Sequence, residues 1–260
     1  MPEFYCRLCN TQAQPTFSAK ILKKYTITYY HCHTCGLLQT EDPYWLKESY
    51  LESINRSDTG ILARNIENSK IVASVIFFFF NKNAKFLDFA GGFGIFTRLM
   101  RDIGFDFLWS DPYTDNLVAR GFEYSGNSEI ELLTCFECFE HLVNPLEDIE
   151  KMLSISQNIF FTTSLLPTPV PKPEQWWYYG LEHGQHVAIY SLDTLQFISR
   201  KYGLFLYSFS NFHLLTKKKI SSSFFKLVVI FHDIFFYSLI KWHQKSRTFS
   251  DMNYLIKKME

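Results

Sequence analysis

Four cysteines near the start of the sequence have the spacing of a zinc site. Cys6 and Cys9 form one C-x2-C pair, and Cys32 and Cys35 form a second pair, with Gly36 directly after it. Two thiolates from each turn can build the tetrahedral four-sulfur cage that Zn2+ prefers, and such a cage leaves no open position for catalysis. The spacing therefore predicts a structural zinc ion, which would supply much of the folding energy of so short a segment. The alternative is four unrelated buried thiols.

The remaining cysteines and the neighbouring histidines are weaker ligand candidates. His31 and His33 flank the second pair and could replace a cysteine, although solvent-facing side chains are the simpler interpretation. Cys135 and Cys138 repeat the spacing, but no further pair completes a cage, so we expect buried thiols there. Met1–Asn10 has no apolar leader, which favours a cytoplasmic protein with free or metal-bound thiols rather than disulfides.

A glycine-rich turn separates a predicted strand from a predicted helix. It contains Ala90, Gly91, Gly92 and Gly94, and Asp88 precedes it in the strand. Glycines let the backbone approach a ligand closely, and the N-terminus of the next helix points at that ligand. The charge of Asp88 would repel a pyrophosphate and suits a cationic ligand. The turn therefore favours S-adenosylmethionine, which carries a sulfonium and an ammonium, over a dinucleotide.

Two side chains outside the turn are candidates for the same cofactor. Asp111 ends the next predicted strand, where an acid can accept hydrogen bonds from both ribose hydroxyls. Arg64 lies before the first of these strands and could bind the cofactor carboxylate, because a guanidinium pairs bidentately with a carboxylate. For Arg64 a solvated helix face is the alternative.

An aromatic segment after the predicted strand at 159–163 is the candidate acceptor site. The proline-rich stretch Pro167–Pro173 takes the chain out of the sheet, because proline cannot continue a strand ladder. The segment that follows contains Tyr178, Glu182, His183 and His186. Methyl transfer to a hydroxyl or an acidic carbon requires a group that takes a proton. His186 is the first candidate for this base and His183 the second, with Tyr178 or Glu182 orienting or assisting; a structural histidine is the alternative.

Two stretches carry a family resemblance. Leu87–Gly94 resembles the first motif of class I S-adenosylmethionine-dependent methyltransferases, and Phe136–Pro145 resembles the segment after the fourth strand of that family. The N-terminal cysteine pairs are similar to those that precede bacterial sugar methyltransferase domains. The resemblance covers roughly residues 55–216. Ala90 stands where many members have glycine, and alanine is expected to be tolerated there only with a negative φ.

The resemblance also implies roles for single residues. Asp88 and the glycine turn would lie beside the methionine part of the cofactor, and Asp111 would hold the ribose. Glu137 would lie near the methionine end, and His141 belongs to the same family pattern. For Glu137 and Glu140 the alternative is an ordinary acid near a helix N-terminus.

Alternating apolar runs and helical patterns predict an α/β fold. Strands are expected at 85–89, 105–110, 131–136 and 159–163, helices at 95–103, 145–153 and 191–202, and a closing hairpin at 204–210 and 212–216. Strand–helix alternation indicates a parallel sheet covered on both faces. With the resemblance, the expected fold is a Rossmann-like class I methyltransferase fold, a mostly parallel seven-stranded sheet with an antiparallel strand.

The chain divides into four predicted parts. We expect a zinc-ribbon-like module with a hairpin at 1–40, a helical linker and cofactor lid at 41–83, the methyltransferase domain at 84–217 and a helical tail at 218–260. In the linker, a helix is predicted over Thr59–Phe80 with Ser57 or Asp58 as its cap. The four phenylalanines Phe77–Phe80 are expected to fill the core.

The tail segment Ser221–Trp242 is rich in apolar residues. It contains Lys226, His232, Asp233 and Lys241, and these polar residues argue against a bilayer-spanning helix. We expect an amphipathic helix that covers the sheet or a partner. A helix on a membrane surface is the second interpretation, because lysines beside Phe and Trp suit that interface.

Composition limits the functions that remain. The 260 residues include 26 Lys and Arg and 26 Asp and Glu, so the formal net charge is zero. Together with 47% hydrophobic residues, this excludes disorder and weighs against a nucleic-acid partner. The sequence therefore predicts a methyltransferase for a sugar, a nucleotide sugar or another small hydroxylated acceptor. The alternatives are a zinc-ribbon RNA or DNA methyltransferase and a non-catalytic binding module.

Overall fold

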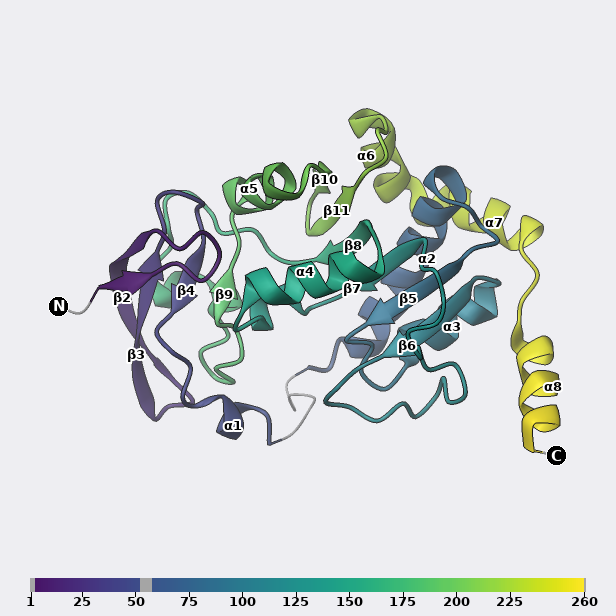
Figure 1. The fold of residues 1–260 in the computed structure, drawn as a ribbon, viewed down its shortest axis with the longest axis horizontal. Coiled ribbons are helices and arrows are strands. Elements are labelled where there is room, and N and C mark those ends of the chain that lie inside the picture. Colours follow the sequence, from purple (N-terminus) through teal and green to yellow (C-terminus); the bar gives the residue numbers. More distant parts are fainter. Residues whose placement is uncertain (1–2, 52–57, 260) are drawn as a thin grey trace.

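The computed structural model describes residues 3–51 and 58–259, which form two sheets with helices around the larger one (Figure 1). The larger sheet has six strands in the order β10-β11-β8-β7-β5-β6. Its strands are β5 (Lys85–Phe89), β6 (Asp106–Ser110), β7 (Leu132–Cys135), β8 (Asn158–Thr162), β10 (Phe205–Phe209) and β11 (Phe212–Thr216). The expected strands and the closing hairpin are therefore present, with ends shifted by one or two residues.

The centre of this sheet is parallel and one side of it is antiparallel. Strands β5, β6, β7 and β8 pair in parallel, whereas β11 is antiparallel to β8 and to β10. The described residues give this sheet six strands rather than the expected seven. Beyond β6 only an isolated bridge joins Trp109 to Glu123. The segment 111–130 lacks the apolar run that a buried strand needs, since polar and turn-forming residues dominate it.

Helices cover both faces of the larger sheet, as the alternation of strands and helices predicts. Helices α2 (Ile61–Phe79) and α3 (Ile95–Ile103) pack on the face that contains Phe86, and α4 (Pro145–Ile155) and α5 (Leu192–Tyr202) pack on the face that contains Leu87. Neighbouring residues of a strand point to opposite faces, so each strand contributes to both cores.

The start and end of α2 test two predictions. Gly60 occupies the N-cap position without a side-chain cap, and of the two predicted caps Ser57 lies outside the described residues. At the other end Phe80 is buried and Phe77, Phe78 and Phe79 are partly buried against the same core. The prediction that these four rings fill the core is thus confirmed for Phe80 and partly for the other three.

The smaller sheet is antiparallel, with the order β1-β2-β3-β4-β9. Its strands are β1 (Phe4–Tyr5), β2 (Gln12–Ile21), β3 (Tyr25–His31), β4 (Leu38–Thr40) and β9 (Ala188–Ile189). The predicted hairpin is β2 with β3. Strand β9 comes from the segment after the predicted acceptor site and pairs with β4. The sheet that begins in the predicted 1–40 module is therefore completed by residues far along the chain.

A second contact links the N-terminal part of the chain to the acceptor segment. The short helix α1 (Leu46–Ser49) follows the buried ring of Trp45, whose Nε1 donates a 2.8 Å hydrogen bond to the carbonyl of Gly184. The cysteine module and the acceptor segment are thus packed against each other at two places.

The C-terminal part of the chain forms one long helix and one separate helix. Helix α6 (Ser222–Phe231), the π-helical turn η4 (His232–Phe236) and α7 (Tyr237–His243) run on without a break and pack against α2, with α6 also against β10. By length and composition alone, Ser222–His243 could cross a membrane, and 28% of its most apolar window is buried. By length and composition, the four polar residues do not exclude a membrane-spanning helix. The packing against α2 and β10 agrees with the predicted helix that covers the domain.

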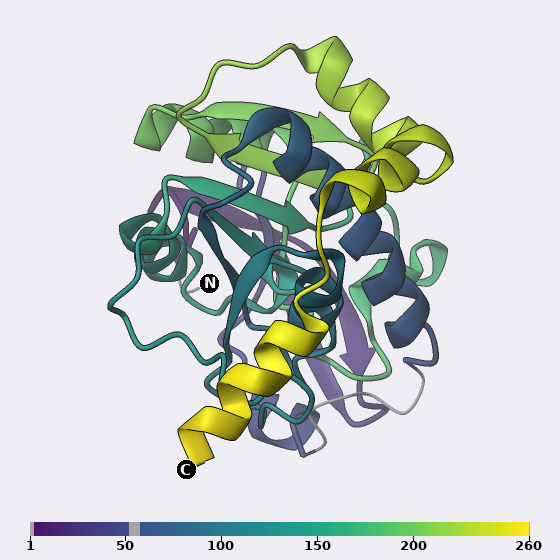
Figure 2. The ribbon, with the colours of Figure 1, turned by 90° about the vertical axis from the view of Figure 1, so that its right-hand side faces the viewer.

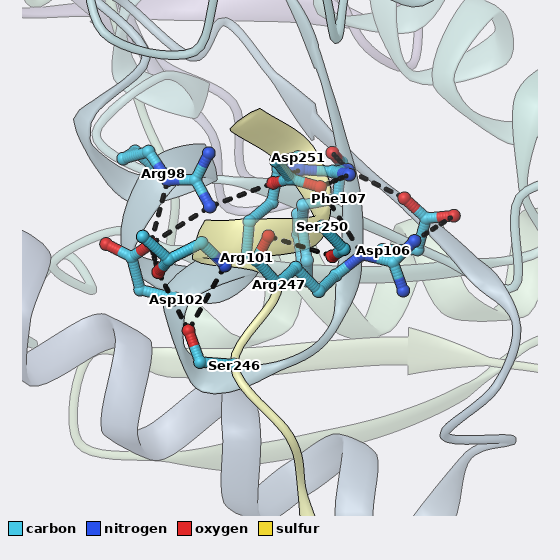
Figure 3. A network of polar contacts seen from close by, with 10 residues as sticks. Arg98, Arg101, Asp102, Asp106, Phe107, Ser246, Arg247, Ser250 and Asp251 are labelled. Atoms are coloured by element: carbon cyan, nitrogen blue, oxygen red, sulfur yellow. Dashed lines mark hydrogen bonds and ion pairs between the residues drawn. The ribbon is translucent and has the colours of Figure 1, made fainter. Parts of the chain in front are cut away.

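Helix α8 (Thr248–Met259) lies apart from α6 and α7 and is fixed by an ionic network (Figures 2 and 3). The buried guanidinium of Arg101 donates to both carboxylate oxygens of Asp251 at 2.7 and 2.8 Å, and to Asp106 at 2.6 Å. Arg98 donates to Asp251 at 2.9 Å. Because removal of one partner would leave a buried charge unpaired, this network holds α8 firmly against α3 and β6.

Candidate active site

The four N-terminal cysteines form one compact cluster. Cys6 and Cys9 lie in the turn after β1, and Cys32 and Cys35 lie between β3 and β4. The Sγ atoms are 3.5 Å apart between Cys6 and Cys35 and 3.4 Å apart between Cys9 and Cys32. Tetrahedral Zn–S bonds of about 2.3 Å require sulfurs roughly 3.8 Å apart, so the cluster fits a zinc ion closely. Donation from Cys35 lowers the pKa of Cys6 to about 5, whereas the same contact and burial raise the pKa of Cys35.

The other predicted ligand candidates stay outside this cluster. Among the described residues the metal-ligating group here consists of the four cysteines alone, without His31 or His33. Cys135 and Cys138 are buried and free, as predicted. The geometry is therefore that of a closed four-thiol site.

The glycine turn joins β5 to α3, and each glycine in it is required for a different structural reason. A Cβ at Gly91 would lie 2.7 Å from Oδ2 of Asp88, so a larger residue does not fit there. At Gly92 the φ angle is +53° and nothing lies within 4 Å, which leaves open space above the backbone. Gly94 has a φ of +83°. The space at Gly92 is where a ligand can approach the main chain.

Ala90 contradicts the expectation for its position. Its φ is +56°, not negative. The left-handed region costs an L-residue with a Cβ roughly 1–2 kcal/mol, and the turn after β5 imposes it because the chain must reverse toward α3. The residue thus stores modest strain at the glycine turn.

Asp88 and Asp111 lie on either side of this turn. Asp88 is fully buried and its Oδ2 accepts a 2.8 Å hydrogen bond from Thr97 Oγ1. Burial raises the pKa of Asp88 to about 7, and the nearby charge of Asp111 adds to the shift. Such a carboxyl gains from a cationic ligand, which would restore its ionised form.

Asp111 organises the loop after β6. Its Oδ2 accepts from the backbone N–H of Gly92 at 2.9 Å, and its Oδ1 accepts from the N–H groups of Tyr113 and Thr114 at 2.8 and 2.9 Å. Asp111 also lines an open cavity of about 710 Å3 together with Trp109. Asp111, which is predicted to bind the ribose, and the glycine turn therefore lie together at the carboxyl edge of the sheet. Ligands of open α/β sheets bind at this edge.

Arg64 and Glu137 are two further residues predicted to bind the cofactor. Arg64 donates two 2.7 Å hydrogen bonds to the carboxylate of Asp58, so its guanidinium already has a bidentate partner. Glu137 is exposed, has a φ of +47°, and accepts a 2.9 Å hydrogen bond from Thr162 Oγ1. The cofactor roles of both residues remain predictions.

A second cluster joins the end of β7 to the acceptor segment. One ligand atom from each of Glu140, His141 and His186 lies within 4.8 Å of the other two. The ring centroids of Tyr178 and His186 are 4.8 Å apart, and those of His183 and His186 are 4.9 Å apart. The structure thus gathers three of the four predicted catalytic residues. His141, which was predicted to bind the cofactor, lies in this cluster.

The fourth predicted catalytic residue is Glu182, and two further residues near the acceptor segment were not predicted. Glu182 is exposed and affects the cluster only by raising the pKa of His183, against the larger lowering by burial. Glu140 and Tyr50 were not expected at the acceptor site; Tyr50 Oη lies 2.8 Å from Nδ1 of His141. Because Glu140 precedes His141 in the sequence, its place at this site could have been predicted. No residue near Tyr50 in the sequence indicates that Tyr50 lies at this site.

Burial governs the electrostatics of this cluster. It raises the pKa of Glu140 to about 8, with the charge of Glu137 as the second cause, and it lowers the pKa of His186 to about 4. The hydroxyl groups of Tyr178 and Thr163 lie close enough to Glu140 to lower its pKa, against the larger effect of burial. Neither hydroxyl makes a hydrogen bond with a carboxylate oxygen of Glu140. Burial lowers the pKa of His141 as well, so His141 and His186 are both neutral at physiological pH, beside an unsolvated carboxyl group.

Comparison with known proteins gives a family match over the middle of the chain. Residues 63–208 match the family model described as a methyltransferase domain, which is more than half of the 260 residues. No curated protein matches the chain.

Solved structures that are similar have low identity throughout. Magnesium protoporphyrin IX methyltransferase from Synechocystis with bound S-adenosylmethionine is 12% identical, with 65% of this chain and 87% of that chain covered and a TM-score of 0.38. A plantazolicin methyltransferase in complex with S-adenosylhomocysteine is 12% identical over 78% and 91%, with a TM-score of 0.46. Human N-acetylserotonin methyltransferase is 12% identical over 67% and 66%, with a TM-score of 0.42. Similarity at this level does not identify an acceptor.

Proposed function

The chain belongs to the methyltransferase domain family, and from this premise we propose that it transfers a methyl group from S-adenosylmethionine to a sugar, a nucleotide sugar or another small hydroxylated acceptor. The observation that carries the proposal is the meeting of two sites at one edge of the sheet. Asp88 and the glycine turn end β5, and Glu140 and His141 follow the neighbouring strand β7. A donor at the first site and an acceptor at the second would therefore be neighbours.

The donor site has the chemistry that a sulfonium cofactor needs. Open space above Gly92 admits the ligand, buried Asp88 supplies potential negative charge, and Asp111 lines the cavity at the ribose position. A helix N-terminus faces a ligand held there. S-adenosylmethionine has a cationic part for Asp88 and ribose hydroxyls for Asp111, whereas a pyrophosphate would be repelled by the charges of the two aspartates.

The acceptor chemistry is an in-line displacement. An electron pair of the acceptor oxygen forms the new bond to the methyl carbon, and the carbon–sulfur bond breaks with its electrons to sulfur, which leaves S-adenosylhomocysteine. The hydroxyl proton passes to a group beside the oxygen. His186 and His183 remain our candidates for receiving it, with Tyr178 orienting the acceptor.

Aromatic side chains support a sugar as acceptor. Trp177 is 78% exposed beside the buried ring of Tyr178, from which its own centroid is 5.4 Å away. An exposed indole next to polar groups can stack on the apolar face of a pyranose. Zero net charge gives no support to the alternative of an RNA or DNA acceptor. Salt-sensitive retention of labelled RNA on filters would support that alternative instead.

Calorimetry with S-adenosylhomocysteine tests the donor site. We expect the wild-type protein to bind it and Asp111→Ala to weaken binding at least about tenfold, since a charged hydrogen-bond acceptor contributes about 1.5–3 kcal/mol. Glu129→Ala, which removes an exposed acid outside the cavity, is the matched control and should bind normally. Absence of binding to the wild type would favour a non-catalytic module with the same fold.

We further propose that the protein is cytoplasmic and touches anionic membrane surfaces through Ser222–His243. Ile234, Phe235 and Trp242 are 70%, 67% and 84% exposed, whereas the opposite side of the helix is buried against the domain. Lys226 and Lys241 flank this apolar face, and the pattern suits adsorption to anionic lipid. A lipid-linked acceptor would then be within reach.

Vesicle sedimentation tests the membrane contact. Vesicles of phosphatidylcholine with phosphatidylglycerol should bind the protein, and Phe235→Ser with Trp242→Ser should reduce the bound fraction at least fivefold. The control Phe249→Ser with Met259→Ser removes equally exposed side chains from α8 and should leave binding unchanged. Equal loss in both double variants would contradict a specific role for this helix.

A further inference from the structure

Three side chains that can bind a metal meet where the two sheets adjoin. Glu140 and His141 lie in the 3-10 turn η1 (Phe139–His141) after β7, and His186 lies two residues before β9. The backbone of Glu140 is fixed in place, because its carbonyl accepts a 2.8 Å hydrogen bond from the N–H of Val187. A carboxylate with two imidazoles is a ligand set that divalent transition metals use, with further positions open.

Glu140 provides the observation that separates this cluster from a chance grouping. Its side chain is fully buried, and neither carboxylate oxygen has a hydrogen-bond partner. Among the described residues no lysine or arginine forms an ion pair with it. A carboxylate removed from water without a donor costs several kcal/mol, so a buried carboxyl group is as a rule protonated, paired or bound to a metal. We infer that Glu140, His141 and His186 together bind one divalent transition-metal ion.

The hydrogen bonds of the histidines orient their free nitrogens. Nδ1 of His186 lies 2.6 Å from the carbonyl oxygen of Tyr178. A carbonyl only accepts, so Nδ1 carries the proton and Nε2 keeps its lone pair. Nδ1 of His141 can donate in the same way to Tyr50 Oη at 2.8 Å. Outer hydrogen bonds of this kind fix the tautomer of metal-binding histidines and raise their basicity.

The chemistry of the site follows from the number of its ligands. Three protein ligands leave positions for an oxygen of the acceptor. A metal-bound hydroxyl loses its proton more easily. With His186 engaged as a ligand, His183 is the remaining candidate for taking that proton, and the freed oxygen would face the cofactor at the neighbouring strand. This role rests on the proposed methyl transfer, whereas the binding of the ion does not.

Titration with Mn2+ tests the site in the full-length protein. The cysteine cluster is first loaded with zinc, which Mn2+ does not displace because it binds thiolates much more weakly. Calorimetry should then give one Mn2+ per chain, and pulsed electron paramagnetic resonance should detect imidazole nitrogens bound to it. Glu140→Gln should weaken Mn2+ binding at least about tenfold. Glu174→Gln, at an exposed glutamate just before the acceptor segment, should bind as the wild type does.

Each result supports or overturns the inference. No Mn2+ binding by the wild type, no imidazole signal, or equal affinity in Glu140→Gln would overturn it. The wild-type spectrum requires no substitution, so a variant that fails to fold does not remove the test. Binding of S-adenosylhomocysteine is measured on the same samples. Cofactor binding without Mn2+ binding would refute the metal site alone, and Mn2+ binding without cofactor binding would refute the proposed methyl transfer alone.

Discussion

The two clusters of metal-binding side chains differ in how they are built. The four cysteines come from two turns of one small sheet, and their sulfurs already have nearly the separations of a zinc cage. The cluster of Glu140, His141 and His186 combines a strand end with a segment more than forty residues away. In the first case the ligands shape the fold around them, and in the second the completed fold brings the ligands together. The first is therefore expected to determine stability and the second to determine activity.

The largest expected effect tests the structural half of this contrast. The double substitution Cys32→Ser with Cys35→Ser should release about one zinc ion per chain and unfold the small sheet, because structural zinc supplies folding energy directly. We expect a loss of more than about 5 kcal/mol in unfolding free energy, measured by urea denaturation with metal analysis. Cys138→Ser is the control and should retain its zinc. A stable zinc-free variant would show that the cysteines are ordinary buried thiols.

The next prediction concerns a buried carboxyl group that is outside both clusters. Burial raises the pKa of Asp88 to about 7 from its ordinary value of 3.8. The folded state therefore holds this proton more tightly than the unfolded state, and its contribution to stability is lost as the pH rises from about 4 to about 7. Asp88→Asn should remove this loss, with a difference on the order of 4 kcal/mol between pH 4 and pH 8.

Urea denaturation of both proteins across this pH range gives the measurement. Saturating S-adenosylhomocysteine, whose ammonium group is a cation, should reduce the pH dependence of the wild type. Glu129→Gln, which alters an exposed acid, is the control and should keep the pH dependence of the wild type. If the Asp88→Asn and wild-type curves run parallel, the carboxyl group is not protonated in the folded protein.

Glu140 tests the functional half of the contrast. Glu140→Gln keeps the size of the side chain and removes the carboxyl group that would bind the metal, so methyl transfer should fall by about a hundredfold, or about 2.7 kcal/mol in activation free energy. The melting temperature should not fall, because the carboxyl group has no hydrogen-bond partner to lose. Turnover with labelled cofactor and thermal melting measure the two quantities. A lower melting temperature at full activity would assign Glu140 to the structure rather than to catalysis.

The smallest expected effect comes from Tyr50. Tyr50→Phe removes the hydroxyl that lies 2.8 Å from Nδ1 of His141 and keeps the ring. If the hydroxyl positions that imidazole, activity should fall about tenfold and its pH profile should shift. Tyr44→Phe alters another exposed tyrosine of the same region and should have no effect. Identical pH profiles for both variants would contradict a positioning role.

The sequence predicted those features whose determinants lie close together in the chain. The cysteine pairs, the glycine turn with Asp88, and the strands and helices around it all depend on short-range spacing, and the structure contains them. Glu140 was underestimated because its environment depends on the segment that packs over it. Nothing local reveals that β9 joins the small sheet or that His186 lies beside Glu140. These depend on how distant segments meet.

The pairing of Arg101 with Asp251 has a consequence for the order of folding. Asp251 is made 150 residues after Arg101. During synthesis β5, α3 and β6 are complete long before this aspartate exists, so the guanidinium has only Asp106 and a main-chain carbonyl of its own neighbourhood as partners. A chain halted before residue 251 would thus carry a half-satisfied cation in its first βαβ unit. The interior of this unit would be completed only after the ribosome has passed that position, long after the strands and the helix of the unit itself have been made.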